Sequence, residues 1–301
     1  MNLKQLEALV WTARLLSFSA AAEKLNATQP GISNSIRKLE EELGVTLFDR
    51  TRQFVRLTPN GRRCVELAEQ IIGIAEDLRI QVGSQDRITG TVRVGVGESI
   101  AMSWLSRLLG RLDQRYPGLA VHLEIGLTVP MIRRLEEQDA DVVIVGGGTT
   151  YLPAKGCAVS YVGSLQFSWL AAPGVYVGPQ PADPRAIAEL RVLTFSPGAM
   201  MQDVIDEWFS RDSVRPTRHI SCDSMTLLGT LARARLGVSL LPRELFADDL
   251  AAGSLEEVAT TAPLDPVHYF AMYTRSRWSS LGQIVAEEAV DVSTYRRVLQ
   301  T

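Results

Sequence analysis

Three polar side chains suited to reading the edges of DNA bases stand close together near residue 30. Gln29, Ser33 and Asn34 fall on the polar side of a predicted helix. The amide of glutamine or asparagine pairs with adenine through two hydrogen bonds, and a serine hydroxyl both donates and accepts. Residues of these types on one side of a helix therefore point to recognition of bases in the major groove.

Basic side chains that suit DNA phosphates or the minor groove surround this group. They are Arg37, Lys38, Arg50, Arg52 and Arg56, and the hydroxyl of Thr28 suits the same purpose. For Arg37 and Lys38 an alternative stays open, because the acidic run of residues 40–42 lies on the same helix. Pairing with that run, or simple solvation, would remove them from the DNA contacts.

The charge of the chain is divided unevenly along its length. The formal net charge is −3, from 31 basic and 34 acidic side chains. Residues 1–65 hold ten basic and six acidic side chains, a net of +4, so the remainder holds 21 and 28, a net of −7. Only the first part is therefore expected to meet a polyanion.

The sequence pattern does not suggest catalysis, metal binding or a disulfide framework. The three cysteines and three histidines are scattered, and no nucleophile with a base or set of paired acids emerges. Gly95-x-Gly97 lacks the third glycine of a dinucleotide fingerprint, and residues 146–148 lack a following lysine and serine. We therefore expect neither an enzyme nor a cofactor or metal. Cys222 ends a predicted strand, where a buried structural thiol is favoured over a redox sensor.

The base-reading residues need a helix-turn-helix to present them. Apolar spacing predicts a first helix from Leu3 to Leu16, and Ser19 is predicted to cap a second helix over residues 20–25. After a short turn, Thr28 caps a third helix, which ends at Gly44. Two helices joined in this way form a helix-turn-helix, whose second helix enters the major groove.

A wing is predicted directly after the third helix. Residues 45–48 and 54–58 have the pattern of two short strands around a basic tip. Arginine at such a tip reaches phosphate or the minor groove. Three helices alone would also suit a protein-interaction module, whereas the wing and the positive charge favour DNA.

The same residues resemble the DNA-binding head of LysR-type transcriptional regulators. The resemblance rests on four runs in the order and spacing of that family: Ser17-Phe18-Ser19-x-Ala21-Ala22-x-x-Leu25, Gln29-Pro30-x-x-Ser33, Leu39-Glu40-x-x-Leu43-Gly44-x-x-Leu47-Phe48-x-Arg50 and Leu57-Thr58-x-x-Gly61. It implies that Gln29, Pro30 and Ser33 lie against base edges. Asn34 stands where many relatives have arginine, which leaves the recognised sequence open, because asparagine prefers adenine and arginine prefers guanine.

A long helix is predicted after the wing. Thr58-Pro59 is a cap with proline at the first helical position, and residues 60–83 contain no further proline. The helix carries an apolar stripe of Cys64, Leu67, Ile71, Ile74 and Leu78. Such a stripe favours pairing with a second copy, although packing on its own domain is the alternative. The resemblance implies a linker helix that joins two heads, and residues 83–86 are typical of a hinge.

Strands and helices alternate through the rest of the chain. The first run places strands at 91–96, 120–125 and 142–145 and helices at 103–116 and 131–138. The second places strands at 191–195, 219–222 and 237–242 and helices at 200–209 and 225–235, with a return near 267–274. This order predicts parallel, doubly wound sheets. It resembles the two-lobed, periplasmic-binding-protein-like effector domain of the same family.

The expected fold is therefore an α/β multidomain chain with an N-terminal winged helix-turn-helix, a long linker helix and a two-lobed α/β effector domain. The head covers residues 1–58, the linker helix and hinge cover 59–88, and the effector domain covers 89–301. Lobe I takes residues 89–161 and 266–301, and lobe II takes residues 162–265.

Ligands of open α/β sheets bind beyond the carboxyl ends of the strands, where loops lead into helices. The candidates in those loops are Glu98, Ser99, Ile100, Thr128, Gly146, Gly147, Ser196, Pro197 and Ser224, with Gly198 and Asp223 beside them. Free amides at helix starts suit a carboxylate or another anion. Ser99, Thr128 and Ser224 are alternatively plain helix caps. An ionised Glu98 that faced inward would repel an anion and favour a cationic or polar group.

The leading hypothesis is a bacterial transcription regulator in the cytoplasm, since no apolar run reaches the 18 residues that span a membrane. It would bind a dyad-symmetric site on double-stranded DNA as a dimer of dimers and respond to a small-molecule effector between its lobes. As an activator it would also contact RNA polymerase. The competing hypothesis is a solute-binding protein or anion-binding enzyme with an accessory N-terminal interaction domain.

Overall fold

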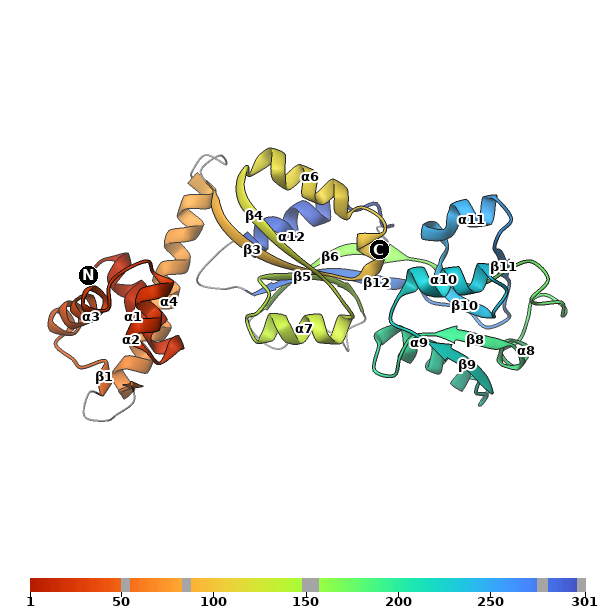
Figure 1. Cartoon of the computed structure of the whole chain (residues 1–301), viewed down its shortest axis with the longest axis horizontal. Coiled ribbons are helices and arrows are strands. Elements are labelled where there is room, and N and C mark those ends of the chain that lie inside the picture. The colour runs from red at the N-terminus through yellow and green to blue at the C-terminus, as the bar shows by residue number, and fades with distance from the viewer. Residues whose placement is uncertain (50–54, 83–87, 148–156, 275–280, 297–301) are drawn as a thin grey trace, which may run out of the picture. The chain divides into compact units, whose positions relative to one another are not determined.

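The structure is a computed structural model that describes residues 1–49, 55–82, 88–147, 157–274 and 281–296. Its elements group into two compact units, one that holds residues 1–85 and one that begins at residue 86 (Figure 1). Each unit has a hydrophobic core of its own, as expected of separately folding domains.

Helices and a short hairpin build the first unit. They are α1 (Leu3–Leu15), α2 (Phe18–Lys24), α3 (Gln29–Leu43), β1 (Phe48–Asp49), β2 (Arg56–Leu57) and α4 (Pro59–Val82). Leu9, Ile36 and Leu39 are fully buried at the centre, because the apolar spacing of α1 and α3 turns one side of each helix inward. The predicted helix-turn-helix is confirmed by α2 and α3.

Two details of the first unit differ from the prediction. The cap of α2 is Ser17 and not Ser19, because Ser17 has the extended backbone of a cap and its hydroxyl accepts a hydrogen bond from the Ala20 amide at 3.2 Å. The wing strands also differ in their described ends, because the first begins at Phe48 and not at residue 45, and the second ends at Leu57 and not at residue 58. The amide of Leu47, within the first predicted strand, hydrogen-bonds to the side chain of Glu40 on α3.

The apolar stripe predicted on α4 divides between two sides of the helix. The helix begins as predicted, with the Thr58 hydroxyl accepting a hydrogen bond from the Gly61 amide at 2.9 Å. Cys64 packs against the core of the head, beside Ala68 and Ile72. The exposed members are Leu67, Ile71, Ile74 and Leu78. Spaced by four, three and four residues, they form an apolar face that the head of the same chain does not cover.

The second unit contains two five-stranded sheets, one in each lobe. The sheet of lobe I has the order β4 (Gly118–Ile125), β3 (Thr89–Val96), β5 (Val142–Gly146), β12 (Val267–Thr274), β6 (Cys157–Leu165). The sheet of lobe II has the order β11 (Glu256–Val258), β7 (Phe167–Ala171), β10 (Val238–Pro242), β8 (Arg191–Thr194), β9 (Arg218–Ser221). The predicted return strand at 267–274 is confirmed as β12.

Each sheet mixes parallel and antiparallel strands, so the prediction of parallel sheets was wrong in part. In lobe I, β3 is parallel to β4 and β5, whereas β12 is antiparallel to both of its neighbours. In lobe II, β8 is parallel to β9 and β10, whereas β7 is antiparallel to β10 and β11. The antiparallel strands arise where the chain crosses between the lobes. The first crossing falls at Gln166, between β6 and β7, and so lies later than the boundary expected after residue 161.

Helices cover both sheets. They are α5 (Glu98–Ala101), α6 (Leu105–Arg115), α7 (Thr128–Glu136), α8 (Pro184–Glu189), α9 (Met200–Ser210), α10 (Met225–Arg233), a 3-10 turn (Arg243–Phe246), α11 (Ala247–Ala251) and α12 (Leu281–Val292). In lobe I, α6 and α12 lie on one face of the sheet and α7 lies on the other (Figure 1). Of the helices in the described part of the chain, none is both long and apolar enough to cross a membrane.

Candidate nucleic-acid interface and ligand cavity

The N-terminal turn of α3 is the exposed end of the helix-turn-helix. Thr28, Gln29, Pro30 and Asn34 are exposed and Ser33 is half-buried, while Ile32 on the opposite side of the helix belongs to the core. The structure thus brings the predicted base-reading residues together on one accessible surface. This arrangement matches the way a recognition helix presents its first turns to a groove.

Thr28 has a double use at this helix end. Its Oγ1 accepts a hydrogen bond from the Gly31 amide at 3.2 Å and so caps α3. The hydroxyl proton remains available to donate to a phosphate oxygen. A Cβ at position 31 would lie only 3.1 Å from this oxygen, so glycine there leaves room for the cap.

Arg37 lies one turn further along α3 and is exposed. Its Nη2 donates to Oδ1 of Asn34 at 2.9 Å, and its Nε lies 3.8 Å from Oε1 of Glu41. The pairing of Arg37 with the acidic run is therefore present. Glu40 serves a different purpose, since its carboxylate accepts the amides of Leu47 and Phe48.

The wing contributes one described basic residue to the candidate interface. Arg56 is exposed on β2, where it pairs with Asp49 of β1 in the antiparallel register. The predicted tip residues Arg50 and Arg52 lie outside the described residues. An exposed arginine on the wing suits a backbone phosphate.

A cavity of about 450 Å³ opens where the loops of the two lobes meet. Five of the nine predicted effector residues line it, namely Glu98, Ser99, Thr128, Gly146 and Ser224. Ile100 is fully buried in the core, and Gly147 lines a smaller cavity near α9. Pro197 lines an open groove in lobe II, and the amide of Ser196 bonds to Asp223. The structure does not bring these four residues to the cavity.

Ser99 and Thr128 are not the helix caps that the sequence left as an alternative. Ser99 is buried and donates to the phenolic oxygen of Tyr269 at 3.0 Å. Thr128 donates to the carbonyl of Gly146 at 2.7 Å. Burial raises the pKa of Tyr269 above its ordinary value, so the phenol stays protonated and remains a donor at the cavity wall.

Ser224 caps α10 and at the same time contacts the other lobe. Its hydroxyl accepts a hydrogen bond from the Leu227 amide at 3.2 Å and donates to Oε1 of Glu98 at 3.0 Å. Glu98 belongs to lobe I and Ser224 to lobe II. The carboxylate of Glu98 therefore points across the cavity rim, towards the start of α10.

The sequence did not indicate most of the apolar wall of the cavity. Tyr269, Phe195, Met200, Met201 and Met225 all line it. Tyr269 comes from β12, directly opposite Gly146 of β5 in the sheet register. A pairing between strands more than a hundred residues apart leaves no local trace in the sequence, so Tyr269 could not be predicted. Met200 and Met225 each begin a helix that was predicted at that position, but the sequence did not indicate that they line a cavity.

All three cysteines are free and half-buried. Burial raises the pKa of Cys64 and, together with nearby Glu136, that of Cys157, so both thiols are poor nucleophiles at neutral pH. The Sγ of Cys222 lies 3.5 Å from the Ser224 carbonyl. Within the described ranges, no group of three or more potential ligand residues is placed to hold a metal ion.

Two protein-family profiles match the chain in consecutive segments. The profile of bacterial regulatory helix-turn-helix proteins of the lysR family matches residues 3–62. The profile of the LysR substrate binding domain matches residues 85–283. The two profiles together account for the helix-turn-helix, the wing, both lobes and the cavity.

Named relatives and solved structures agree with these profiles. The HTH-type transcriptional regulator GltR of Bacillus subtilis (strain 168) is 26% identical over 259 residues, which make up 85% of this chain and 84% of that protein. A full-length OxyR variant from Pseudomonas aeruginosa has a TM-score of 0.65 at 22% identity, covering 100% of this chain and 99% of that chain. Full-length LysG from Corynebacterium glutamicum with bound effector Arg has a TM-score of 0.64 at 20% identity, covering 99% of this chain and 100% of that chain. At such identities the two structures show that the fold is shared along the chain.

Proposed function

The chain belongs to the LysR family of bacterial DNA-binding transcriptional regulators, and we propose that it reads a dyad-symmetric operator through the N-terminal turn of α3. It is a regulator and not an enzyme, with a DNA-binding head and an effector-binding domain. Because its target is chromosomal DNA, we place its site of action in the cytoplasm. We assign residues 1–58 to the head, 59–88 to the linker and 89–301 to the effector domain.

The residues of the head divide into base-reading and backbone-binding groups. Gln29, Pro30 and Ser33 face base edges, with Asn34 beside them. While Oδ1 of Asn34 is held by Arg37, its amide nitrogen is free to donate to a base acceptor. Thr28, Arg37, Arg50, Arg52 and Arg56 bind phosphates or enter the minor groove.

A second copy of the chain completes the DNA-binding unit. The exposed face of Leu67, Ile71, Ile74 and Leu78 on α4 has the spacing of a coiled-coil seam. Pairing two such helices would bury this face and bring two heads together, one for each half-site of the operator. Two dimers assemble into the tetramer.

The cavity between the lobes is the effector site. A ligand there contacts both lobes at once, so its binding changes their relative angle and, through the linker helices, the spacing of the heads. When the regulator acts as a transcription activator, altered DNA bending and contact with RNA polymerase follow. The cavity volume of about 450 Å³ suits a small organic molecule.

The capped, exposed first turn of α3 carries this proposal, because it holds Thr28 and Gln29 in solvent at the end of a helix packed on a wing. Fluorescence anisotropy with a labelled duplex from the region upstream of its own gene tests it. We expect affinity to fall about a thousandfold or more between 50 and 200 mM salt, as phosphate contacts release counterions. Absence of a salt-dependent complex would refute the proposed function.

A further inference from the structure

Glu98 makes a four-part contact between the lobes at the edge of the effector cavity. It is the first residue of α5 in lobe I, and its carboxylate accepts hydrogen bonds from four groups at the start of α10 in lobe II. These are the Ser224 hydroxyl at 3.0 Å, the Met225 amide, the Thr226 amide at 3.2 Å and the Thr226 hydroxyl at 2.9 Å. One carboxylate of lobe I is thus joined to lobe II by four hydrogen bonds.

The start of α10 is a place where an anion is stabilised. The first amides of a helix have no partner within it, and the helix dipole adds a partial positive charge there. Here the chain itself supplies the anion, and Glu98 takes up the amides of Met225 and Thr226 together with both side-chain hydroxyls. An external carboxylate would find these donors already used.

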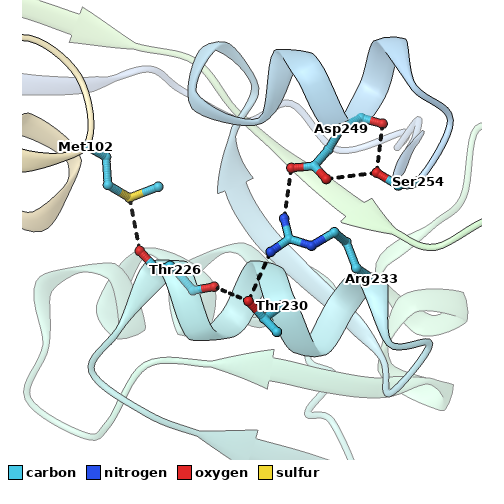
Figure 2. A network of polar contacts seen from close by, with 6 residues as sticks. All are labelled: Met102, Thr226, Thr230, Arg233, Asp249 and Ser254. Atoms are coloured by element: carbon cyan, nitrogen blue, oxygen red, sulfur yellow. Dashed lines mark hydrogen bonds and ion pairs between the residues drawn. The ribbon is translucent and has the colours of Figure 1, made fainter.

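Hydrogen bonds within lobe II stabilise the helix α10, whose start binds Glu98. Figure 2 shows the polar contacts along one side of α10, from Thr226 to Thr230 and Arg233 and on to Asp249. The Thr230 hydroxyl donates to the Thr226 carbonyl at 2.9 Å, Arg233 donates to Thr230 at 3.0 Å and to Asp249 at 2.8 Å. Of the residues that bind Glu98, Thr226 is therefore tied into a hydrogen-bond network of its own lobe, which preorganises it.

Lobe I adds a second contact at the same place. The sulfur of Met102, one helical turn after Glu98, lies 3.5 Å from the Thr226 hydroxyl oxygen (Figure 2). That hydroxyl has one proton, and the carboxylate at 2.9 Å is the stronger acceptor. Met102 thus lies beside the Glu98 contact.

The rest of the cavity has the wrong charge for an anion. Among its described lining residues there is no lysine, arginine or histidine, while Glu98 and Asp223 both contribute carboxylates. Asp223 is exposed, and one of its oxygens accepts the Ser196 amide at 3.2 Å. The remaining wall is largely apolar, with Met200, Met225 and Phe195. A ligand with an apolar body and a cationic group fits this lining better than a carboxylate does.

We propose that Glu98 is an internal ligand of the effector cavity, which fills the anion-binding end of α10, excludes carboxylates from it and leaves the cavity to an apolar effector with a cationic group. This rests on the proposed function, in that the cavity between the lobes is the effector site. Because Glu98 is tethered, it competes at a high effective concentration, and a free carboxylate has to displace it. Removal of Glu98 is therefore expected to create a carboxylate site that the wild-type protein lacks.

The test compares two probes with the same apolar body, 3-phenylpropionate and 3-phenylpropylamine, by titration calorimetry on the full chain. Wild-type protein should bind the amine more tightly than the carboxylate. Glu98→Ala should bind the carboxylate at least tenfold more tightly than wild type does. Glu98→Gln keeps the size of the side chain without its charge. Its affinity for the carboxylate should lie between those of wild type and Glu98→Ala. Glu137→Ala removes the same charge from an exposed position of lobe I outside the cavity and should behave as wild type.

Hydrogen exchange provides a readout that needs no ligand. The amides of Met225 and Thr226 should exchange at least tenfold faster in Glu98→Ala than in wild type or Glu137→Ala, because their acceptor is gone. Unchanged exchange, failure of Glu98→Ala to bind 3-phenylpropionate, or equal carboxylate affinity of Glu98→Ala and wild type would each overturn the proposal. DNA binding is measured in parallel, so that failure of the proposed function can be told apart from failure of the Glu98 proposal. Absence of DNA binding by wild type would refute the proposed function without altering these exchange rates.

Discussion

The carboxylate of Glu40, on the recognition helix, accepts a hydrogen bond from the backbone amide of Leu47 at 2.7 Å. The same oxygen accepts the Phe48 amide at 3.2 Å. Leu47 is fully buried in the core of the head. The base of the wing is thereby fixed to the helix that we propose reads DNA, and the two are expected to act as one rigid surface.

Glu40→Ala should therefore weaken DNA binding indirectly, through the position of the wing and not through a DNA contact of Glu40 itself. Two amides lose their acceptor, and we expect the free energy of unfolding of the head to fall by about 2 kcal/mol. Affinity for operator and random DNA should fall together, because the wing loses its position. Urea denaturation and anisotropy measure the two effects.

The control for this change is Glu41→Ala, which removes the same charge one residue later. Glu41 is exposed and lies 3.8 Å from Arg37, so its loss should change the stability by less than about 0.5 kcal/mol. Equal stability of the two variants would show that the contact between Glu40 and Leu47 does not hold the wing.

The apolar face of α4 is expected to pair with a second chain. Ile74 is 67% exposed and lies within that face, so Ile74→Glu should place a charge in the seam and convert dimers or tetramers into monomers. Sedimentation velocity at micromolar concentration measures the change. Ile74→Leu keeps the apolar contact and should leave the assembly intact. A wild-type protein that is already monomeric would contradict the assignment.

Gly146 sets the space available in the effector cavity. A Cβ at this position would lie 3.1 Å from the Tyr269 ring and 3.2 Å from Cε of Met200. Tyr269 is held by its strand and by Ser99, so Gly146→Ala should displace the flexible Met200 into the cavity. We expect affinity for 3-phenylpropylamine to fall about tenfold while DNA binding persists.

Gly110→Ala is a matched control for Gly146→Ala. A Cβ at position 110, in α6, meets no atom within 4 Å. This change should leave ligand affinity unchanged and raise helix stability by up to about 1 kcal/mol. If Gly146→Ala binds the probe as well as Gly110→Ala does, the cavity is not the binding site.

Glu288 on α12 stabilises lobe I through ion pairs with two arginines, in which the carboxylate is buried and the arginines are partly exposed. Its side chain is 5% exposed and contacts Arg111 and Arg115, which are 35% and 39% exposed. Replacing both arginines by alanine leaves a buried carboxylate without a cation and should cost about 3 kcal/mol or more. Glu288→Gln leaves arginines that water can reach, and should cost about 1–2 kcal/mol. Thermal denaturation checks the order, and a larger loss for Glu288→Gln would contradict it.

The sequence predicted those parts of the fold that depend on local chemistry. Thr28 and Gly44 bound the recognition helix, and Thr58 starts the linker helix, because caps act within one turn. Ser17 was missed in favour of Ser19, since both residues are good caps and only the backbone conformation decides between them.

Long-range contacts account for most of what the sequence did not predict. β6 and β7 are joined by Gln166 alone, so no helical pattern separated them, and the crossing between lobes went unnoticed. The approach of Tyr269 to Gly146 depends on strand pairing. The sequence raised the question of where Glu98 points, and only the packing of lobe I against α10 answers it.

Direct readout of bases by the first turn of α3 is the central claim. Arg56→Ala should weaken binding to operator and random DNA alike and reduce the salt slope by about one, as expected of a phosphate contact. Gln29→Ala should instead lower operator affinity about ten- to a hundredfold and leave random DNA unchanged, because a base contact supplies discrimination.

The ratio of operator to random-DNA affinity, measured by anisotropy at one salt concentration, tests this claim most directly. We predict a ratio of about a thousand or more for wild type. Gln29→Ala should lower this ratio, whereas Arg56→Ala should preserve it. A wild-type ratio near one, or an equal ratio in wild type and Gln29→Ala, would contradict the account.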